Sequence, residues 1–149
     1  MKKVLATLLV VAMVLPMVFA QGAKEAKQVE LVYTMTAVPT DAHAGAMMVF
    51  KETVERLSGG EIKVLTYDSA SLFKQEQEVA AVKSGQADIT ATAASWLTDG
   101  SPWVSMFTAG YIFKSYDHMT KVLNGPVGQE IFERIAKEQG IRPLGAQYL

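Results

Sequence analysis

The chain has 149 residues, of which 50% are hydrophobic and 19% charged, and its 14 Lys and Arg nearly balance its 15 Asp and Glu. This length suits one domain, and so large an apolar fraction with a formal net charge of -1 excludes an intrinsically disordered chain. The absence of cysteine excludes disulfides, zinc sites with cysteine ligands, a thiol nucleophile and a lipid-modified N-terminal cysteine. Nucleic acid is also excluded as a partner, because phosphate binding requires a basic surface and the formal net charge of -1 does not indicate one.

Residues 1–20 have the pattern of a secretory signal peptide. Lys2 and Lys3 form a short basic head, and the apolar segment Val4–Ala20 follows it. We expect cleavage after Ala20, with Ala23 as the alternative position. An uncleaved membrane anchor is the competing interpretation, although this segment is near the lower length limit for crossing a bilayer. Residues 21–28 are small and polar, and we expect them to form a flexible leader before the folded domain.

The first folded elements are predicted to be a strand and a helix. β-Forming residues predict the strand over Val29–Thr36. A helix follows, with Thr40 or Asp41 as its N-cap, and it ends at Gly59-Gly60 because glycine adopts the left-handed conformation found at helix ends. The apolar spacing predicts that the buried side of this helix comprises Met47, Phe50, Val54 and Leu57.

The same alternation continues through two more strands. We expect a strand over Ile62–Tyr67, a helix over Leu72–Ser84 with Ser71 as its N-cap, and a strand over Ile89–Ala93. Strands that alternate with helices of this length predict an α/β domain with a mostly parallel sheet and helices on both faces. The crossover connections should be right-handed.

The regular alternation ends after the third strand. The apolar segment Met106–Phe113 is expected to lie extended on the sheet, and Asp117 to cap a short helix that ends at Leu123. A longer helix from Pro126 ends at Gly140, because proline suits the first turn and glycine the C-cap. Residues Ile141–Leu149 are predicted to begin another strand, within which the sequence stops.

Two pairs of neighbouring Asp and His side chains are the candidates for acid–base or metal chemistry. They are Asp41 with His43, and Asp117 with His118. A metal site requires three or four converging ligands, and neither pair provides them locally. Both pairs lie at expected helix starts, so we interpret the aspartates as N-caps and predict no catalytic residues, no metal ligands and no cofactor.

Two further patterns have structural explanations. The spacing Ser71-x-x-Lys74 matches the serine–lysine motif of acylated-serine enzymes, but the companion motifs of that mechanism are absent from the sequence. Glu76 and Glu78 resemble paired carboxylates, but residues two apart point to different sides of a helix. We therefore expect these glutamates to form a solvated face.

The residues that should converge are those at the carboxyl ends of the strands. In an open α/β sheet, ligands bind outside these ends, where the strand order reverses. The loops and helix starts at this edge offer hydroxyls, an amide, an imidazole and an indole, which suit hydrogen bonding and stacking of a small polar solute. Our candidate ligand-binding residues there are Thr36, Thr40, His43, Gln75, Ala93 and Trp96. For Trp96, simple core packing is the alternative.

The sequence resembles the N-terminal lobe of the DctP-like solute receptors of tripartite ATP-independent periplasmic (TRAP) transporters. The resemblance covers nearly all of 29–149, and the segments in register are Thr36–His43, Leu57–Gly60, Ile62–Val64, Gly85–Ile89, Tyr111–Phe113, Asn124–Glu130 and Gly140–Gly145. It implies a type II periplasmic-binding-protein fold, in which an organic acid lies between two lobes and the closed receptor docks on membrane subunits. It also implies solute contacts at Thr36, Gln75 and Ala93–Trp96.

The resemblance predicts that the sequence lacks a second lobe. The family's carboxylate-binding arginine belongs to that lobe and would follow Leu149, and Arg56, Arg134 and Arg142 are not placed to replace it. We therefore expect a periplasmic receptor fragment for a small carboxylate, without enzymatic activity. The competing hypotheses are an enzyme of the same fold that uses Asp41 and His43, and a small binding module that is complete in itself.

Overall fold

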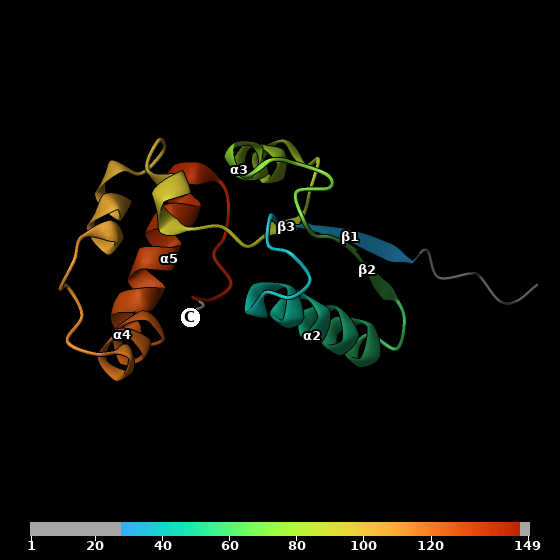
Figure 1. Cartoon of the computed structure of the whole chain (residues 1–149), viewed down its shortest axis with the longest axis horizontal. Helices are drawn as coiled ribbons and strands as arrows, with labels where there is room; N and C mark the ends of the chain where they lie inside the picture. Colours follow the sequence, from blue (N-terminus) through green and yellow to red (C-terminus); the bar gives the residue numbers. More distant parts are fainter. Residues whose placement is uncertain (1–27, 147–149) are drawn as a thin grey trace, which may run out of the picture.

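The computed structural model describes residues 28–146. Its sheet has three parallel strands in the order β2-β1-β3, namely β1 (Val29–Thr34), β2 (Ile62–Tyr67) and β3 (Ile89–Thr90). Helix α2 (Ala42–Leu57) connects β1 to β2, and helix α3 (Gln75–Ser84) connects β2 to β3. Because β1 is central, the two crossovers run in opposite directions along the sheet, and right-handed connections then place α2 and α3 on opposite faces (Figure 1). The α/β prediction is confirmed.

The face of the sheet covered by α2 contains an apolar core. Tyr33 of β1 and Met35, just after this strand, are buried against Met47 of α2, together with Ala44 and Val64. Phe50 packs edge-on against Tyr33, with ring centroids 5.6 Å apart. The predicted stripe is therefore correct for most of the helix. It is wrong at Leu57, which is 73% exposed because it is the last residue of α2, where the chain turns towards β2.

Two charged residues of α2 form hydrogen bonds with the backbone of Val64 in the edge strand β2. The Glu55 carboxylate accepts a hydrogen bond from the Val64 N–H at 3.0 Å, and the Lys51 ammonium donates to the Val64 carbonyl at 2.7 Å. Lys51 and Glu55 also form an ion pair. The hydrogen bond from Lys51 lowers the pKa of Glu55. This pair blocks one unpaired position of β2, which would otherwise be open to association with another strand.

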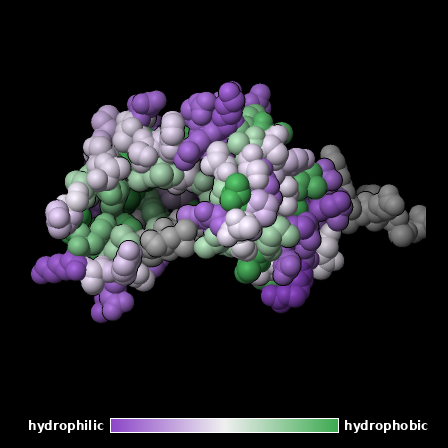
Figure 2. All heavy atoms as spheres, in the orientation of Figure 1, coloured by the Kyte–Doolittle hydropathy of each residue, from purple (hydrophilic) through white to green (hydrophobic). Residues whose placement is uncertain are grey.

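The second half of the chain forms a group of helices beside the sheet (Figure 1). It comprises the 3-10 helices η1 (Ala94–Leu97) and η2 (Pro102–Thr108) and the helices α4 (Tyr116–Leu123) and α5 (Pro126–Gln139). Several large apolar side chains are exposed here, including Met106, Tyr111 and Tyr116. Figure 2 shows an apolar hollow on the side of the molecule that these helices occupy.

A carboxylate on α5 holds η2 in place. Glu138 accepts hydrogen bonds from the Ser101 hydroxyl, the Trp103 indole N–H at 2.7 Å and the Arg134 guanidinium at 2.8 Å. The Arg134 guanidinium also lies 4.4 Å from the centroid of the Trp103 ring. These contacts, the one from Ser101 foremost, lower the pKa of Glu138 to about 2. The carboxylate is therefore charged under ordinary conditions and holds the two helices together.

The side chain of Gln139, at the end of α5, connects the helical group to the sheet half. Its amide donates to the Leu97 carbonyl at 2.7 Å and accepts from the Lys83 ammonium of α3 at 2.8 Å. A Cβ atom at Gly100 would come within 2.8 Å of the Gln139 side chain, so the chain passes close to this connection. The contact joins η1, α3 and α5.

Two predicted helix starts are wrong. Helix α3 begins at Gln75 with Lys74 as its N-cap, not at Leu72, and the Ser71 hydroxyl instead donates to the Asp68 carbonyl within the preceding turn. Helix α4 is capped by Ser115, whose hydroxyl accepts from the His118 N–H at 3.1 Å, and Asp117 lies in the first turn. In each case the turn before the helix places a different residue at the N-cap.

Two strands are also shorter than predicted, and two predicted extended segments are absent. Strand β1 ends at Thr34 and β3 at Thr90, because the chain bends away after the sheet pairing ends. The segment Met106–Phe113 does not lie extended on the sheet, since η2 and a series of turns occupy it. The described residues 141–146 contain no strand. The expected signal peptide, and all but the last residue of the expected leader, lie outside the described residues.

Candidate functional site

The carboxyl ends of the strands form one edge of the sheet, with the end of β1 in the centre. The loop after β2 is fixed against the loop after β1, because the Ser69 N–H donates to the Ala37 carbonyl at 2.9 Å and the Ala70 N–H donates to the Met35 carbonyl at 3.2 Å. Ser69 and Ala70 have positive φ angles of 54° and 55°, which the tight turn requires. Thr36 lies at the centre of this edge, between the ends of β2 and β3.

The N-terminus of α2 projects towards the same edge. The Asp41 carboxylate accepts the His43 N–H at 2.8 Å and lies 2.8 Å from the His43 Nδ1 atom. This confirms Asp41 as the N-cap. The backbone hydrogen bond from His43, followed by the contact with its ring, lowers the pKa of Asp41. Thr40 is exposed in the loop just before this cap.

The N-terminus of α3 approaches the edge from the other face of the sheet. Gln75 is the first residue of this helix and is half-buried. The Lys74 N–H donates to the Gln77 side chain at 3.1 Å, which fixes the first turn. His43, in the first turn of α2, and Gln75, at the start of α3, therefore belong to helices on opposite faces of the sheet. A helix start carries partial positive charge, which favours an anion. At α2 the Asp41 carboxylate already accepts the His43 N–H.

The chain after β3 completes the edge. Ala93 precedes η1 and is exposed, and its carbonyl accepts a hydrogen bond from the Trp96 N–H at 3.0 Å. The Trp96 side chain is 40% exposed. Core packing therefore does not account for this tryptophan. The structure thus places Thr36 after β1, Gln75 at the start of α3, and Ala93 and Trp96 after β3. All four therefore lie at the edge where the sequence predicts that a ligand binds.

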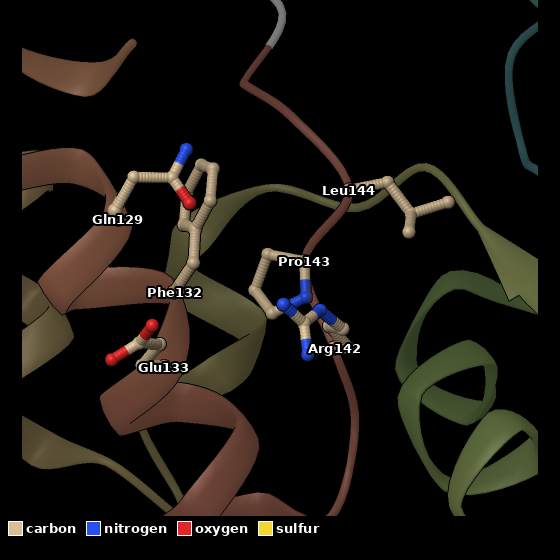
Figure 3. Close-up of a pocket in the computed structure, with 6 residues that line it drawn as sticks. All are labelled: Gln129, Phe132, Glu133, Arg142, Pro143 and Leu144. Atoms are coloured by element: carbon tan, nitrogen blue, oxygen red, sulfur yellow. The ribbon is translucent and has the colours of Figure 1, made fainter. Parts of the chain in front are cut away.

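A small cavity lies elsewhere, between α5 and the segment that follows it. Its volume is about 140 Å³, and Figure 3 shows its lining residues, which are Gln129, Phe132, Glu133, Arg142, Pro143 and Leu144. None of them belongs to the predicted set. Arg142 is exposed and lies in an irregular segment, not at the start of a strand. This cavity is therefore separate from the strand edge.

Sequence reasoning missed a buried polar group beneath α3. Glu78 is 0% exposed, so its assignment to a solvated face is wrong. Both of its carboxylate oxygens lack a hydrogen-bond partner, as do the hydroxyls of Thr34, Thr90 and Thr92. Burial raises the pKa of Glu78 to about 7. The repeated threonines on helix-covered strands were the available signal, because alternate residues of a strand share one face.

Two other site types have no support in the described residues. Within residues 28–146, His, Asp and Glu side chains form no cluster of three or more that could hold a metal ion. In the same part of the chain, no helix has both the length and the apolar character needed to cross a membrane.

Comparisons with a family model and with known proteins indicate the same family. The sequence model of the DctP family, bacterial extracellular solute-binding protein, family 7, matches residues 33–148. A solute-binding protein of Roseobacter denitrificans is 28% identical over 125 residues, which are 84% of this chain and 38% of that protein. The C4-dicarboxylate-binding protein DctB of Bacillus subtilis is 31% identical over 90 residues, 60% of this chain and 26% of that protein.

Solved structures have the same fold. A TRAP periplasmic solute-binding protein of Roseobacter denitrificans with bound L-galactonate has a TM-score of 0.73 at 27% identity, and the match covers 78% of this chain and 39% of that one. A TRAP protein of Sulfurospirillum deleyianum with bound succinate has a TM-score of 0.69 at 27% identity, and the match covers 74% of this chain and 36% of that one.

These similarities agree with the type II periplasmic-binding-protein fold, and they cover only part of each relative. The chain spans less than two fifths of the length of the relatives that it matches. The family match, in contrast, extends over most of the chain and includes the whole strand edge described above. This protein therefore belongs to the DctP family of bacterial extracellular solute-binding proteins.

Proposed function

We propose that this chain supplies one lobe of a periplasmic receptor that captures a small organic acid for import by a TRAP transporter. The observation that carries the proposal is the edge around Thr36, where the starts of α2 and α3 meet the ends of β1 and β3. Helix starts attract a carboxylate, and Gln75 and Trp96 add hydrogen bonding and an apolar surface beside them.

The solute class follows from the relatives. Succinate and L-galactonate, which are bound to the two solved relatives described above, share a carboxylate group. In the proposed mechanism, the acid bridges this lobe and a second one and shifts the population from an open to a closed form. The closed form then docks on TRAP membrane subunits. The strongest contact to the carboxylate, a bidentate arginine, would come from the second lobe.

Binding to this lobe alone should therefore be weak but specific for the charged group. We would titrate the chain with succinate and with L-galactonate at millimolar concentrations and follow the backbone and indole N–H signals by NMR. The expected result is a set of shifts at Thr36, Gln75 and Trp96. Succinamide and galactitol, which lack the carboxylates, are the matched controls. Equal shifts with acids and controls would contradict the proposal.

Calorimetry separates this proposal from a self-sufficient module. One lobe provides only half of the contacts, so we expect no heat signal corresponding to micromolar affinity for any of these acids. Micromolar binding by residues 21–149 would show that a second lobe is not required.

The enzyme hypothesis depends on the contact between Asp41 and His43. The same carboxylate oxygen that contacts the imidazole also caps α2, so the pair has a structural use. Replacing His43 with Ala should leave most solute binding intact in a receptor. Loss of a measurable turnover in this variant would instead support the enzyme.

The proposed location also has a direct test. If residues 1–20 are a cleaved signal peptide, protein recovered from the periplasm should begin at Gln21, and mass spectrometry of its N-terminal peptide identifies the position. Recovery only with membranes and an intact Met1 would support the anchor hypothesis.

A further inference from the structure

The interface between α3 and the sheet is polar. The face covered by α2 buries Tyr33 and Met35, whereas the face under α3 buries the carboxyl group of Glu78. Both oxygens of this carboxyl group are out of contact with water and have no hydrogen-bond partner. A buried charge without a partner is strongly unfavourable, so the state of this group matters for the packing of α3.

Three threonine hydroxyls accompany the carboxyl group. Thr34 of β1 is the register partner of Thr90 of β3, so the two side chains lie side by side on one face of the sheet. Thr92 follows two residues after Thr90. All three hydroxyls are buried and lack partners. The Thr90 hydroxyl lies close enough to Glu78 to counteract part of the rise in its pKa, although neither group completes a hydrogen bond.

No cation is paired with Glu78 in the described part of the chain. Strand β3 and helix η1 carry no ionisable side chain, and on β1 the nearby titratable group is Tyr33. Its pKa is raised, mainly by burial and further by the Glu78 charge. Lys83, on α3 itself, donates to Gln139. Asp88, before β3, accepts the Val32 N–H at 2.7 Å.

The uncharged form of the carboxyl group suits these surroundings. A protonated carboxyl group has one O–H donor and one carbonyl acceptor, and threonine hydroxyls can both accept and donate. Small rotations of the side chains would then satisfy Glu78 and at least one threonine. An ionised carboxylate has no donor and would need more hydrogen bonds than the hydroxyls supply. Burial correspondingly raises the pKa of Glu78 to about 7.

We propose that Glu78 takes up a proton when α3 packs on the sheet, and that its ionisation above neutral pH loosens this packing. The cluster of Glu78, Thr34 and Thr90 thus makes the position of α3 sensitive to pH. Glu76, the other glutamate of this helix, is exposed and therefore serves as the comparison residue.

The direction of the pH effect on stability follows from the pKa of Glu78 in the unfolded and folded states. Glu78 has its ordinary pKa of 4.5 when unfolded and about 7 when folded, so the folded state binds more protons between these values. Stability is greatest below the unfolded-state value and falls as the pH rises through the folded-state value. From about pH 5 to about pH 8, the folding equilibrium constant should decrease roughly 70-fold through this group alone.

The test compares urea unfolding of the full chain with that of Glu78→Gln and Glu76→Gln variants at both pH values. Glutamine keeps the shape of glutamate but has no charge to lose. The ratio of the wild-type folding constant to that of Glu78→Gln should therefore fall about 70-fold from the lower to the higher pH, whereas the ratio to Glu76→Gln should stay constant. A constant ratio for Glu78→Gln would overturn the proposal.

A second measurement needs no variant. Carbon-13 NMR of the side-chain carboxyl groups in the unmodified chain gives the pKa of Glu78 directly. A midpoint near 7 supports proton uptake. A midpoint at or below the ordinary value overturns it. A further contradictory result would be stability at the higher pH that increases more with sodium than with potassium at the same concentration, because a bound sodium ion would then occupy the cluster.

Discussion

The corner between α4 and α5 provides the sharpest test of the fold. Gly128, in the first turn of α5, is buried against the end of α4. A Cβ atom at this position would lie 1.9 Å from the Leu123 carbonyl oxygen and 2.4 Å from its carbon. Both atoms belong to the backbone, so no side-chain rotation can make room. Gly45 in α2 is the matched control, because its Cβ would meet nothing within 4 Å.

Replacing glycine with alanine should thus have opposite effects on stability at Gly128 and Gly45. At Gly128, reaching ordinary contact at 3.4 Å requires a shift of about 1.5 Å (3.4 − 1.9), which separates α5 from α4. Overpacking of this kind costs about 3 kcal/mol, and the better helix propensity of alanine returns about 1 kcal/mol, leaving a net loss of about 2 kcal/mol. Gly45→Ala gains about 0.5–1 kcal/mol from propensity alone.

Urea unfolding of the full chain, followed by circular dichroism, measures both free energies of unfolding. The variants should differ by about 3 kcal/mol, or roughly 6–12 °C in Tm for a domain of this size. If Gly128→Ala remains within about 0.5 kcal/mol of the wild type, the packing of α4 on α5 described here is incorrect. A destabilising Gly45→Ala would refute the exposed placement of that residue.

Substitutions at three more positions, the first with a matched control, test the α2 core, its cap and the connection between the two halves. Met47→Ala should lower the free energy of unfolding by about 2–5 kcal/mol because Met47 is 1% exposed, whereas Val49→Ala, at a residue 64% exposed, should change it by less than about 0.5 kcal/mol in the same urea assay. Asp41→Ala should lower Tm more above about pH 5 than near pH 2. Because the pKa of Asp41 is lowered in the folded state, its carboxylate stabilises the fold above its ordinary pKa, and this stabilisation is lost as the pH falls through the folded-state pKa. Equal losses of Tm at the two pH values would contradict the role of Asp41 as the cap. Gln139→Ala removes the acceptor of Lys83 and should speed amide hydrogen exchange in α3, which mass spectrometry measures; unchanged exchange would show that the contact does not restrain this helix.

The sheet half of the molecule was largely predictable because its patterns are local. The apolar spacing of α2 indicated most of its buried side, and Asp41 was among the expected N-caps. The limits of β2 were correct at both ends. Alternating strands and helices then implied the parallel sheet and the edge around Thr36. Whether that edge binds a solute stays a prediction.

The second half was less predictable because its conformation depends on contacts far along the chain. The segment around Met106 is apolar enough for a strand, but Ser101 and Trp103 are held by Glu138, which lies 35 or more residues away. No local pattern in the sequence predicts that the Glu138 carboxylate makes these contacts. At α4, Ser115 and Asp117 are both good caps by composition, and the backbone conformation before the helix decides between them.

The contrast between α2 and α3 explains why one helix followed its pattern and the other did not. Helix α2 packs through an apolar stripe, which is the signal that a periodicity argument detects. Helix α3 has at its centre Glu78, a residue type that is expected in water, and the strands beneath it offer threonines. A charged side chain can occupy such a position only where it loses its charge or gains a partner. The failure to predict the face of α3 and the pH sensitivity proposed for it therefore have one cause, the buried carboxyl group.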